Sequence, residues 1–236
     1  MATLYIVGTP IGNLEDMTIR SQKILSEVDL ICAEDTRTSR VLLDRYGITT
    51  SMVPYHDFNK QKMGPHIVAQ LKAGKNIALI SDAGMPGIAD PAFNLVREAI
   101  KENIAVVPIP GPSALITALV CSGLPTDRFI FENFLPPKSA KRKRILKSFK
   151  DEPRTVIFYE TPHRILSVLR DMDETMPDVQ IVIGRELTKM YEEFLRGTPK
   201  SLLSHFEKKP PRGEMVLMFN MRIKADQDPE NSTNLP

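Results

Sequence analysis

The sequence predicts an α/β protein that contains parallel sheets and is organised in two domains. Short apolar segments alternate with helical patterns through the first half of the 236-residue chain. Strands separated by helices form parallel βαβ units. Three of the apolar segments run directly into loops rich in glycine and proline. Because open α/β sheets bind ligands at the carboxyl ends of their strands, these loops predict one ligand-binding crevice.

The first half contains alternating strands and helices. Strands are predicted at 3–8, 29–34, 49–55, 76–82 and 105–109. Helices are predicted at 17–27, 38–46, 59–73, 91–102 and 112–121. Gly47 and Gly74 follow two of these helices, at the position where a left-handed residue often ends a helix. Pro112 lies in the first turn of the last helix, where its missing N–H loses no hydrogen bond.

A turn-rich break at 122–128 predicts the boundary between a first domain, 1–121, and a second domain, 122–222. The second domain has predicted strands at 128–134, 154–160, 178–184 and 213–220. Its predicted helices are 139–149, 162–172 and 199–208. The remaining residues, 223–236, are polar and predict a disordered tail.

Composition is that of an ordinary globular protein, with 42% hydrophobic residues, 25% charged residues and a net charge of +2. Cys32 and Cys121 stand far apart in apolar stretches, so we expect two buried free thiols rather than a disulfide. No basic leader precedes an apolar segment and no apolar run is long enough to span a membrane, so we expect a cytoplasmic protein without a membrane partner. The histidines lack metal-ligand spacing, which predicts no metal site.

The three loops, 7–13, 81–91 and 108–114, have the composition of a rigid ligand pocket. The first lacks the Gly-x-Gly-x-x-Gly spacing of dinucleotide-binding enzymes, and the chain contains no Gly-Lys-Ser/Thr phosphate loop. Proline stiffens each loop, and glycine allows the backbone to approach a ligand closely. The loops therefore favour a compact, nucleotide-like cofactor held largely by backbone groups.

Seven motifs, in order through residues 4–220, resemble the tetrapyrrole-methylase superfamily of S-adenosylmethionine-dependent methyltransferases. They are VGTPIGNL (7–14), AEDTRTS (33–39), SDAGMP (81–86), PGPSA (110–114), YETPHR (159–164), RELTK (185–189) and RGE (212–214). Within the superfamily the chain is similar to bacterial enzymes that methylate a cytidine ribose in small-subunit rRNA. The resemblance implies two α/β domains of the class III methyltransferase type, with the methyl donor in the cleft between them, and a homodimer. It also implies a decoding-region cytidine of 16S rRNA, in the small ribosomal subunit, as the substrate.

Carried over position by position, the resemblance assigns donor contacts to the loops and to the second domain. The loop residues are Pro10, Gly84, Met85, Ile88, Ala89, Ser113 and Ala114. The second domain contributes Leu187 and either Phe158 or Tyr159. Relatives that act on tetrapyrroles often carry Gly-Asp-Pro in the second loop, whereas Met85 precedes proline here. The nearest acid is Asp82, and its contact with the donor's amino group is a hypothesis.

Methyl transfer to a ribose hydroxyl requires a group that accepts the proton. The candidates are Glu34, Asp35, Asp82 and Glu160, and the sequence does not distinguish them. Arg37 or Lys189 can instead stabilise negative charge that develops on the oxygen. The alternative for segment 34–40 is a helix cap by Asp35 or Thr36, accompanied by a surface ion pair.

Segment 138–147 contains six basic residues in ten and no acidic residue. Lysine and arginine release counterions when they bind phosphates, so an RNA-binding surface is favoured over a solvated helix face. The predicted RNA contacts in this segment are Lys138, Lys141, Arg142, Lys143 and Arg144. Contacts to substrate phosphate or ribose are also predicted for Arg37, Arg40, Arg164, Arg185 and Lys189. Two alternatives stay open: a methyltransferase for a small tetrapyrrole or another metabolite, and a non-catalytic RNA-binding protein.

Overall fold

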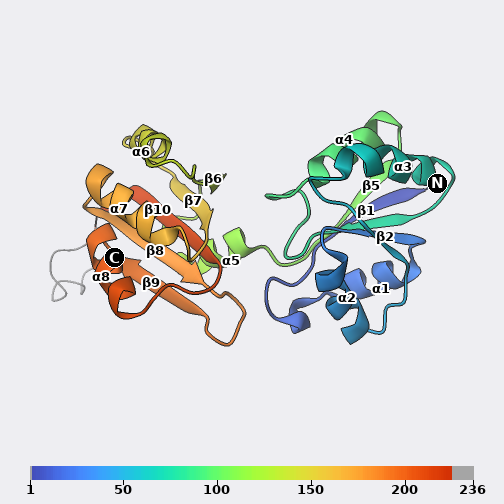
Figure 1. Cartoon of the computed structure of the whole chain (residues 1–236), viewed down its shortest axis with the longest axis horizontal. Helices are drawn as coiled ribbons and strands as arrows, with labels where there is room; N and C mark the ends of the chain where they lie inside the picture. Colours follow the sequence, from blue (N-terminus) through green and yellow to red (C-terminus); the bar gives the residue numbers. More distant parts are fainter. Residues whose placement is uncertain (1, 225–236) are drawn as a thin grey trace. The chain divides into compact units, whose positions relative to one another are not determined.

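The computed structural model describes residues 2–224 and consists of two compact units (Figure 1). The first unit ends at Ser113 and the second begins at Ala114. Helix α5 (Ala114–Ser122) packs against strands of the second unit. The division therefore lies before this helix, whereas the turn-rich break at 122–128 predicts it after the helix.

The first unit is a parallel sheet covered by helices on both faces. The five strands have the order β3-β2-β4-β1-β5, and every neighbouring pair is parallel. The strands are β1 (Thr3–Val7), β2 (Leu30–Ala33), β3 (Met52–Pro54), β4 (Ile77–Ile80) and β5 (Ala105–Ile109). The helices are α1 (Ile19–Glu27), α2 (Thr36–Arg45), α3 (Lys60–Lys72) and α4 (Ala92–Lys101), with a 3-10 turn η1 (Leu14–Asp16).

Two apolar cores flank this sheet because successive strand residues point to opposite faces. Leu4 and Ile6 of β1 pack into the core beneath α3 and α4. Val7 packs into the other core, beneath α1 and α2. Strands β2 and β4 are buried along their whole length, as expected for strands covered on both faces.

The second unit is a mixed sheet of order β6-β7-β10-β8-β9. Its strands are β6 (Phe129–Phe134), β7 (Thr155–Glu160), β8 (Val179–Arg185), β9 (Glu193–Gly197) and β10 (Met215–Lys224). Within residues 2–224, the β6–β7 pair of this sheet is parallel and its other strand pairs are antiparallel. The helices, besides α5, are α6 (Ser139–Ser148), α7 (Ile165–Thr175) and α8 (Pro199–Lys208).

Two features of the second unit differ from the prediction. Strand β9 was not predicted, because Phe194 and Leu195 are its only large apolar residues. Strand β10 continues to Lys224, so residues 223 and 224 are strand rather than part of a disordered tail. The rest of that predicted tail, 225–236, lies outside the described residues.

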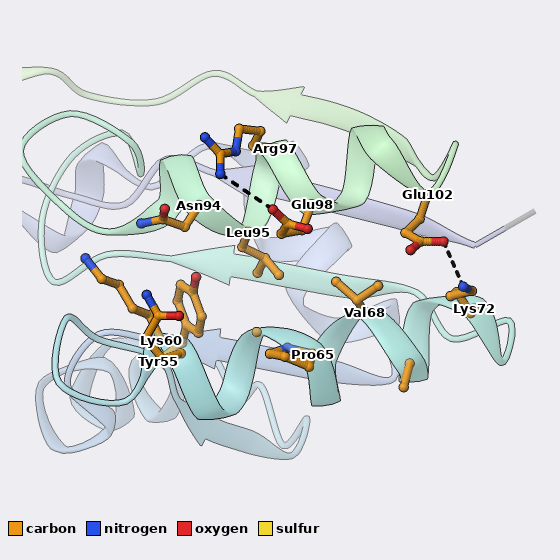
Figure 2. Close-up of a pocket in the computed structure, with 13 residues that line it drawn as sticks. Tyr55, Lys60, Pro65, Val68, Lys72, Asn94, Leu95, Arg97, Glu98 and Glu102 are labelled. Carbon is orange, nitrogen blue, oxygen red and sulfur yellow. Dashed lines mark hydrogen bonds and ion pairs between the residues drawn. The ribbon is translucent and has the colours of Figure 1, made fainter.

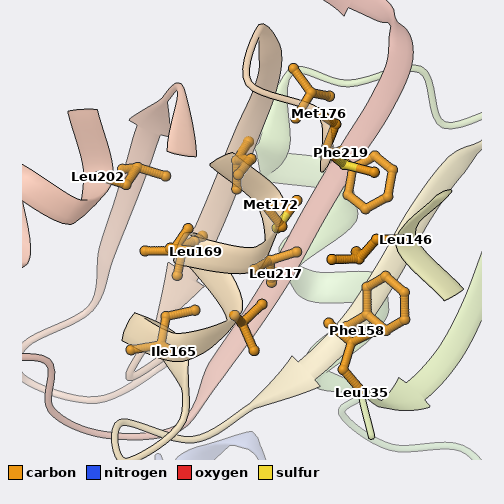
Figure 3. Close-up of a cluster of buried hydrophobic side chains, with 14 of the residues drawn as sticks. Leu135, Leu146, Phe158, Ile165, Leu169, Met172, Met176, Leu202, Leu217 and Phe219 are labelled. Carbon is orange, nitrogen blue, oxygen red and sulfur yellow. The ribbon is translucent and has the colours of Figure 1, made fainter. Parts of the chain in front are cut away.

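One large apolar core fills the space between this sheet and helices α6, α7 and α8 (Figure 3). Phe158 of β7 and Phe219 of β10 stack within it, with ring centroids 6.3 Å apart. Leu146 of α6 and Met172 of α7 pack into the same cluster. No helix within residues 2–224 is long and apolar enough to cross a lipid bilayer.

The two cysteines occupy different environments. Cys32 is buried in β2, as expected, and burial raises the pKa of its thiol to about 12. Cys121 is exposed near the end of α5, which corrects the prediction that both thiols are buried. A thiol-disulfide exchange reagent should therefore modify Cys121 rapidly in the native protein and Cys32 only after unfolding. Peptide mass mapping checks this assignment, and rapid native modification of Cys32 would contradict the fold of the first sheet.

Candidate functional site

The three glycine/proline loops follow β1, β4 and β5, which are neighbours in the first sheet. Their backbones are joined directly. The Thr9 N–H donates to the Gly84 carbonyl at 2.9 Å, and the Gly84 N–H donates to the Thr9 carbonyl at 3.1 Å. The Gly8 N–H donates to the Ile109 carbonyl at 3.1 Å. The first loop is thus fixed to both of its neighbours at the carboxyl edge of the sheet.

Gly8 and Gly111 allow the first and third loops to touch. A Cβ atom at Gly8 would lie 2.7 Å from the Gly111 Cα atom and 2.7 Å from the Met85 Sδ atom. A Cβ atom at Gly111 would lie 2.8 Å from the Gly8 Cα atom. In two of these three contacts the added Cβ atom meets a backbone atom, which cannot give way as a flexible side chain does. Glycine is therefore required at both positions by close packing rather than by a turn.

Gly8→Ala is expected to lower the free energy of unfolding by about 1–3 kcal/mol, the usual effect of overpacking a tight site. Gly64→Ala is the matched control, because a Cβ atom at Gly64 of α3 meets nothing within 4 Å. Alanine favours helix over glycine by about 1 kcal/mol, so the control should be as stable as wild type or more stable. Urea unfolding compares the two variants. Equal stability would contradict the close contact between the loops.

The second loop holds three residues in left-handed backbone conformations: Gly84, Gly87 and Ala89 have φ values of 79°, 97° and 68°. The Asp90 carboxylate fixes the loop by accepting hydrogen bonds from the N–H groups of Gly87 and Ala92, each at 2.8 Å. A non-glycine residue in this conformation is strained, and such strain often accompanies ligand-binding loops.

Three of the four proton-acceptor candidates meet at the ends of β2 and β4. An Asp82 carboxylate oxygen accepts the Asp35 N–H at 2.9 Å, and the Asp82 N–H donates to the Glu34 carboxylate at 3.5 Å. Burial raises the pKa of Glu34 and also that of Asp82. Desolvation favours the protonated form of a carboxyl group and so makes its anion a stronger base.

The pKa of Asp35 is lowered, in contrast to the pKa values of Glu34 and Asp82. Asp35 caps helix α2 through the Arg37 N–H, and its carboxylate lies 2.6 Å from the Arg37 guanidinium. These hydrogen bonds to Arg37 lower the pKa of Asp35 to about 2. The alternative interpretation of this segment, a helix cap with a surface ion pair, is therefore confirmed. Arg40 lies on the same helix, with its guanidinium 4.0 Å from the exposed Asp44 carboxylate.

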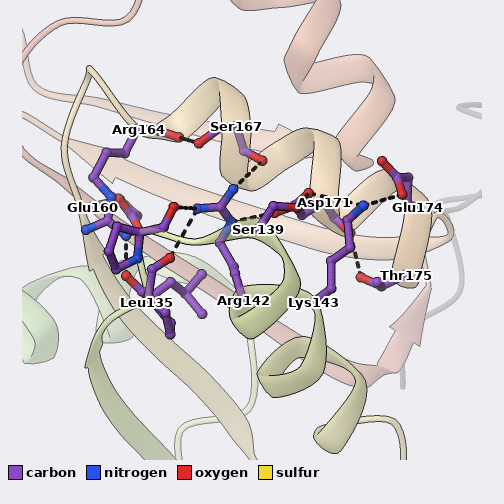
Figure 4. Close-up of polar contacts among 12 residues, drawn as sticks. Leu135, Ser139, Arg142, Lys143, Glu160, Arg164, Ser167, Asp171, Glu174 and Thr175 are labelled. Carbon is purple, nitrogen blue, oxygen red and sulfur yellow. Dashed lines mark hydrogen bonds and ion pairs between the residues drawn. The ribbon is translucent and has the colours of Figure 1, made fainter.

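Glu160 lies apart from the other three candidates, at the end of β7 in the second unit. Its side chain is fully buried, and burial raises its pKa. Arg164 donates to the Glu160 carboxylate at 3.2 Å and also to the Leu135 carbonyl (Figure 4). Arg164, which we predicted to contact substrate, is thus held within the second unit.

The basic segment contains one residue that cannot bind RNA. Arg142 of α6 is buried, with 4% of its side chain exposed, and its Nε atom lies 2.6 Å from the Asp171 carboxylate (Figure 4). Its other guanidinium nitrogens donate to the carbonyls of Pro136, Pro137 and Ser167. The predicted RNA contact of Arg142 is wrong because the side chain joins α6 to α7.

Other residues that we predict to contact RNA form ion pairs with carboxylates of the protein. The Lys143 ammonium lies 2.5 Å from Glu174 and 3.6 Å from Asp171 of α7. Farther along the chain, Arg185 pairs with Glu193 at 2.6 Å, and Lys189 pairs with Glu186 at 2.9 Å. The exposed basic residues of segment 138–147 are Lys138, Lys141, Arg144 and Lys147.

The predicted donor contacts divide between the two units. Pro10, Asp82, Gly84, Met85, Ile88, Ala89 and Ser113 belong to the first unit, and Ala114, Phe158, Tyr159 and Leu187 belong to the second. Phe158 is buried in the core and is unavailable to a ligand, so the choice between Phe158 and Tyr159 falls on Tyr159. Tyr159 is half-buried, and its ring centroid lies 4.8 Å from that of Phe131.

A pocket of about 330 Å³ adjoins the acidic cluster of Glu34, Asp35 and Asp82. Its lining residues are Pro10, Leu14, Thr38, Ser39, Val41, Leu42, Ser81 and Asp82. Pro10 and Asp82 are predicted site residues, and Arg37 and Arg40 of α2 are predicted substrate contacts. The residues of α2 that line the pocket were not predicted; they are Thr38, Ser39, Val41 and Leu42. The signal that identifies them is the run Thr36, Thr38 and Ser39, three hydroxyl residues at the start of a helix that follows a strand end.

A larger groove, of about 470 Å³, lies between α3 and α4 (Figure 2). It contains none of the predicted site residues. The Lys72 ammonium lies 2.7 Å from Glu102, and the Arg97 guanidinium lies 3.8 Å from Glu98. We therefore take the smaller pocket as the candidate site, because only there do the strand-end loops and raised-pKa carboxyls meet. Within residues 2–224, no group of three or more His, Cys, Asp or Glu side chains is arranged to hold a metal.

Residues 3–203 match the family model of the tetrapyrrole (corrin/porphyrin) methylases. The chain belongs to that family. A Thermotoga maritima protein named ribosomal RNA small subunit methyltransferase I is 50% identical over 220 residues, covering 93% of this chain and 99% of the relative. A Synechocystis protein of the same name is 46% identical over 236 residues, covering 100% of this chain and 85% of the relative.

Solved structures of low sequence identity share the fold. A diphthine synthase superposes with a TM-score of 0.78 at 14% identity. The match covers 95% of this chain and 92% of the diphthine synthase chain. A cobalt precorrin-4 methyltransferase of cobalamin biosynthesis superposes with a TM-score of 0.69 at 16% identity. The match covers 92% of this chain and 94% of the methyltransferase chain. The predicted α/β class and the predicted methylase family are thus confirmed.

Proposed function

We propose that the chain transfers the methyl group of S-adenosylmethionine to the ribose 2′-oxygen of a cytidine in 16S rRNA. The observation that carries this proposal is 45–50% identity, over nearly the whole chain, to proteins named ribosomal RNA small subunit methyltransferase I. Membership of a methylase family supports the choice of donor. A substrate in the small ribosomal subunit implies a cytoplasmic enzyme, and the homodimer implied by the resemblance stays a prediction.

The second loop has the features that this donor requires. The left-handed residues Gly84, Gly87 and Ala89 turn the backbone sharply, and hydrogen bonds to Thr9 and Asp90 hold that shape. Ile88, between them, is an exposed large apolar side chain. We propose that this loop, with Pro10 and Ser113, holds the donor from the first unit; the contacts of Ala114, Tyr159 and Leu187 stay predictions. The bound sulfonium supplies an electrophilic methyl group, so the protein's task is placement.

We assign the proton of the 2′-hydroxyl to Asp82. The 2′-oxygen bonds to the methyl carbon, the carbon–sulfur electron pair stays on sulfur, and the hydroxyl proton passes to the Asp82 carboxylate. Burial raises the pKa of Asp82, which makes it a better proton acceptor than Asp35, whose pKa is about 2. Glu160 is enclosed within the second unit and paired with Arg164. Glu34, whose carboxylate accepts the Asp82 N–H, is the second candidate.

The exposed basic residues Lys138, Lys141, Arg144 and Lys147 are proposed to bind RNA phosphates. Lys141→Ala should weaken RNA binding and reduce the slope of log affinity against log salt concentration by about one. Lys62→Ala, which removes an exposed lysine from α3 in the first unit, is the matched control and should leave the slope unchanged. Filter binding over a range of salt concentrations measures both slopes. Equal slopes would remove Lys141 from the proposed surface.

The proposed function is tested by methyl transfer from radiolabelled S-adenosylmethionine to three acceptors. They are small ribosomal subunits that lack the modification, protein-free 16S rRNA, and a small tetrapyrrole. We expect label in the rRNA. Label in the tetrapyrrole alone would favour the metabolite methyltransferase, and RNA binding without donor binding would favour the non-catalytic alternative.

A further inference from the structure

We propose that the pocket beside Asp82 binds the nucleoside of the acceptor RNA whose ribose is methylated. This inference rests on the proposed function and adds to it the binding site of the acceptor. The pocket measures about 330 Å³. Ligand pockets span roughly 300–1,000 Å³, so this one is of a size for a single nucleoside rather than for a macrocycle of four pyrrole rings.

The first observation is a buried hydroxyl that has no partner. Ser39 lines the pocket and is 3% exposed. Its backbone N–H donates to the Asp35 carbonyl at 3.0 Å, but its Oγ atom finds no hydrogen-bond partner anywhere in residues 2–224. Buried polar atoms are nearly always hydrogen-bonded in native proteins. A polar group of a bound nucleoside would supply the missing partner.

The second observation is the character of the pocket walls. Pro10, Leu14, Val41 and Leu42 supply apolar surface, and Thr38, Ser39, Ser81 and Asp82 supply polar groups. Enzymes that act on a nucleotide taken out of its stack hold the base between apolar side chains and contact its edge through hydrogen bonds. Val41 is 64% exposed, which leaves its side chain available to a base. The walls therefore match a planar ring with polar edges.

The third observation is the charge beside the pocket. Arg37 and Arg40 flank Thr38 and Ser39 along α2, and both arginines are exposed. Their ion pairs, with Asp35 and Asp44, lie at the surface, and the Arg37 and Arg40 side chains are 90% and 46% exposed. Each arginine can therefore exchange its carboxylate partner for a phosphate of the RNA strand. A nucleotide within a chain fits this arrangement because its base would enter the pocket while its phosphates stay outside.

The fourth observation is the position of the proposed proton acceptor. Asp82 lines the pocket, and Pro10 belongs both to the pocket and to the first glycine/proline loop. The Thr9 and Gly84 backbones join that loop to the proposed donor loop. A ribose bound here would therefore lie beside its proton acceptor and next to the loops that we assign to the donor.

Two variants test the pocket in the full-length protein with undermethylated small subunits as acceptor. Ser39→Ala removes one hydrogen bond to the nucleoside and should raise KM for subunits about tenfold, the effect expected of one lost hydrogen bond. Val41→Glu introduces an anion at the exposed wall and should lower kcat/KM at least as much. Ile100→Glu is the matched control, because Ile100 of α4 is 60% exposed and lies outside the pocket. Donor affinity, measured by calorimetry, should equal that of wild type in all three variants.

The outcomes distinguish this inference from the proposed function. An active wild type whose KM is unchanged by Ser39→Ala would overturn the pocket assignment and leave the function standing. A fall in donor affinity in Ser39→Ala would overturn it as well, because the pocket would then hold the donor. A wild type that binds donor and methylates no RNA would overturn the proposed function, and the pocket assignment with it.

Discussion

Asp82→Asn is expected to reduce kcat for RNA methylation by about 10²–10⁴-fold, the usual contribution of a positioned proton acceptor. The asparagine keeps a side-chain oxygen that can accept the Asp35 N–H, a hydrogen bond of 2.9 Å in the wild type. The substitution therefore removes the charge and the basicity while it preserves the contact between the β2 and β4 loops. Donor affinity should stay within a few-fold of wild type.

The pH dependence gives a second measure of the same group. Because burial raises the pKa of Asp82, protonation should remove the base at a higher pH than for an ordinary aspartate. The value of kcat/KM should fall as the pH drops through this raised pKa, and Asp82→Asn should abolish that acid limb. Asp35→Asn is the matched control, because a carboxyl with a pKa of about 2 is a weak base and its loss should change turnover little.

Different outcomes would identify another base or none. A collapse of turnover in Glu34→Gln, with Asp82→Asn active, would transfer the role to Glu34. If the amide variants of Glu34, Asp35, Asp82 and Glu160 all stay within a few-fold of wild type, general-base catalysis by these carboxylates is excluded. Placement of the two substrates would then account for the rate.

Asp171→Ala is expected to lower the free energy of unfolding by about 3–5 kcal/mol, the effect of leaving a buried charge without its partner. The guanidinium of Arg142 would lose the carboxylate that lies 2.6 Å away. Ser139 would also lose its partner, since its hydroxyl donates to the other Asp171 carboxylate oxygen at 2.8 Å. The contact between α6 and α7 depends on this network (Figure 4).

Glu174→Ala is the control for this prediction. Glu174 of α7 pairs with Lys143 of α6, but its side chain is 63% exposed, and such pairs contribute about 0–1 kcal/mol. Urea unfolding of both variants measures the difference. If Asp171→Ala is no less stable than Glu174→Ala, the Arg142–Asp171 pair does not hold the two helices together.

Most elements of the fold follow from local sequence patterns, because alternating apolar segments and amphipathic helices determine the βα order. Two features depend on tertiary contacts instead. The apolar helix α5 is visible in the sequence, but the sheet that it covers is not, so the domain boundary was expected after it rather than before it. Strand β9 has little apolar character and exists because it pairs with β8.

The candidate site also has parts that local sequence patterns predict and parts that depend on tertiary contacts. Loops after β1, β4 and β5 were expected to converge, because parallel strands end at one edge. Segment 138–147 has no acidic residue of its own, but α7 supplies Asp171 and Glu174 from a distant part of the sequence. Phe158 and Tyr159 point to opposite faces of β7, and only the packed structure shows which face is the core.

The chemical position of the methyl group in labelled 16S rRNA tests whether the enzyme methylates ribose. Alkali cleaves RNA through the free 2′-hydroxyl, so a 2′-O-methyl group protects the adjacent phosphodiester bond. Alkaline hydrolysis followed by nucleoside mass spectrometry should find the label in a resistant dinucleotide whose first nucleoside is 2′-O-methylcytidine. Label released as a base-methylated mononucleotide would contradict ribose methylation, and with it the assignment of Asp82 as the acceptor of a 2′-hydroxyl proton.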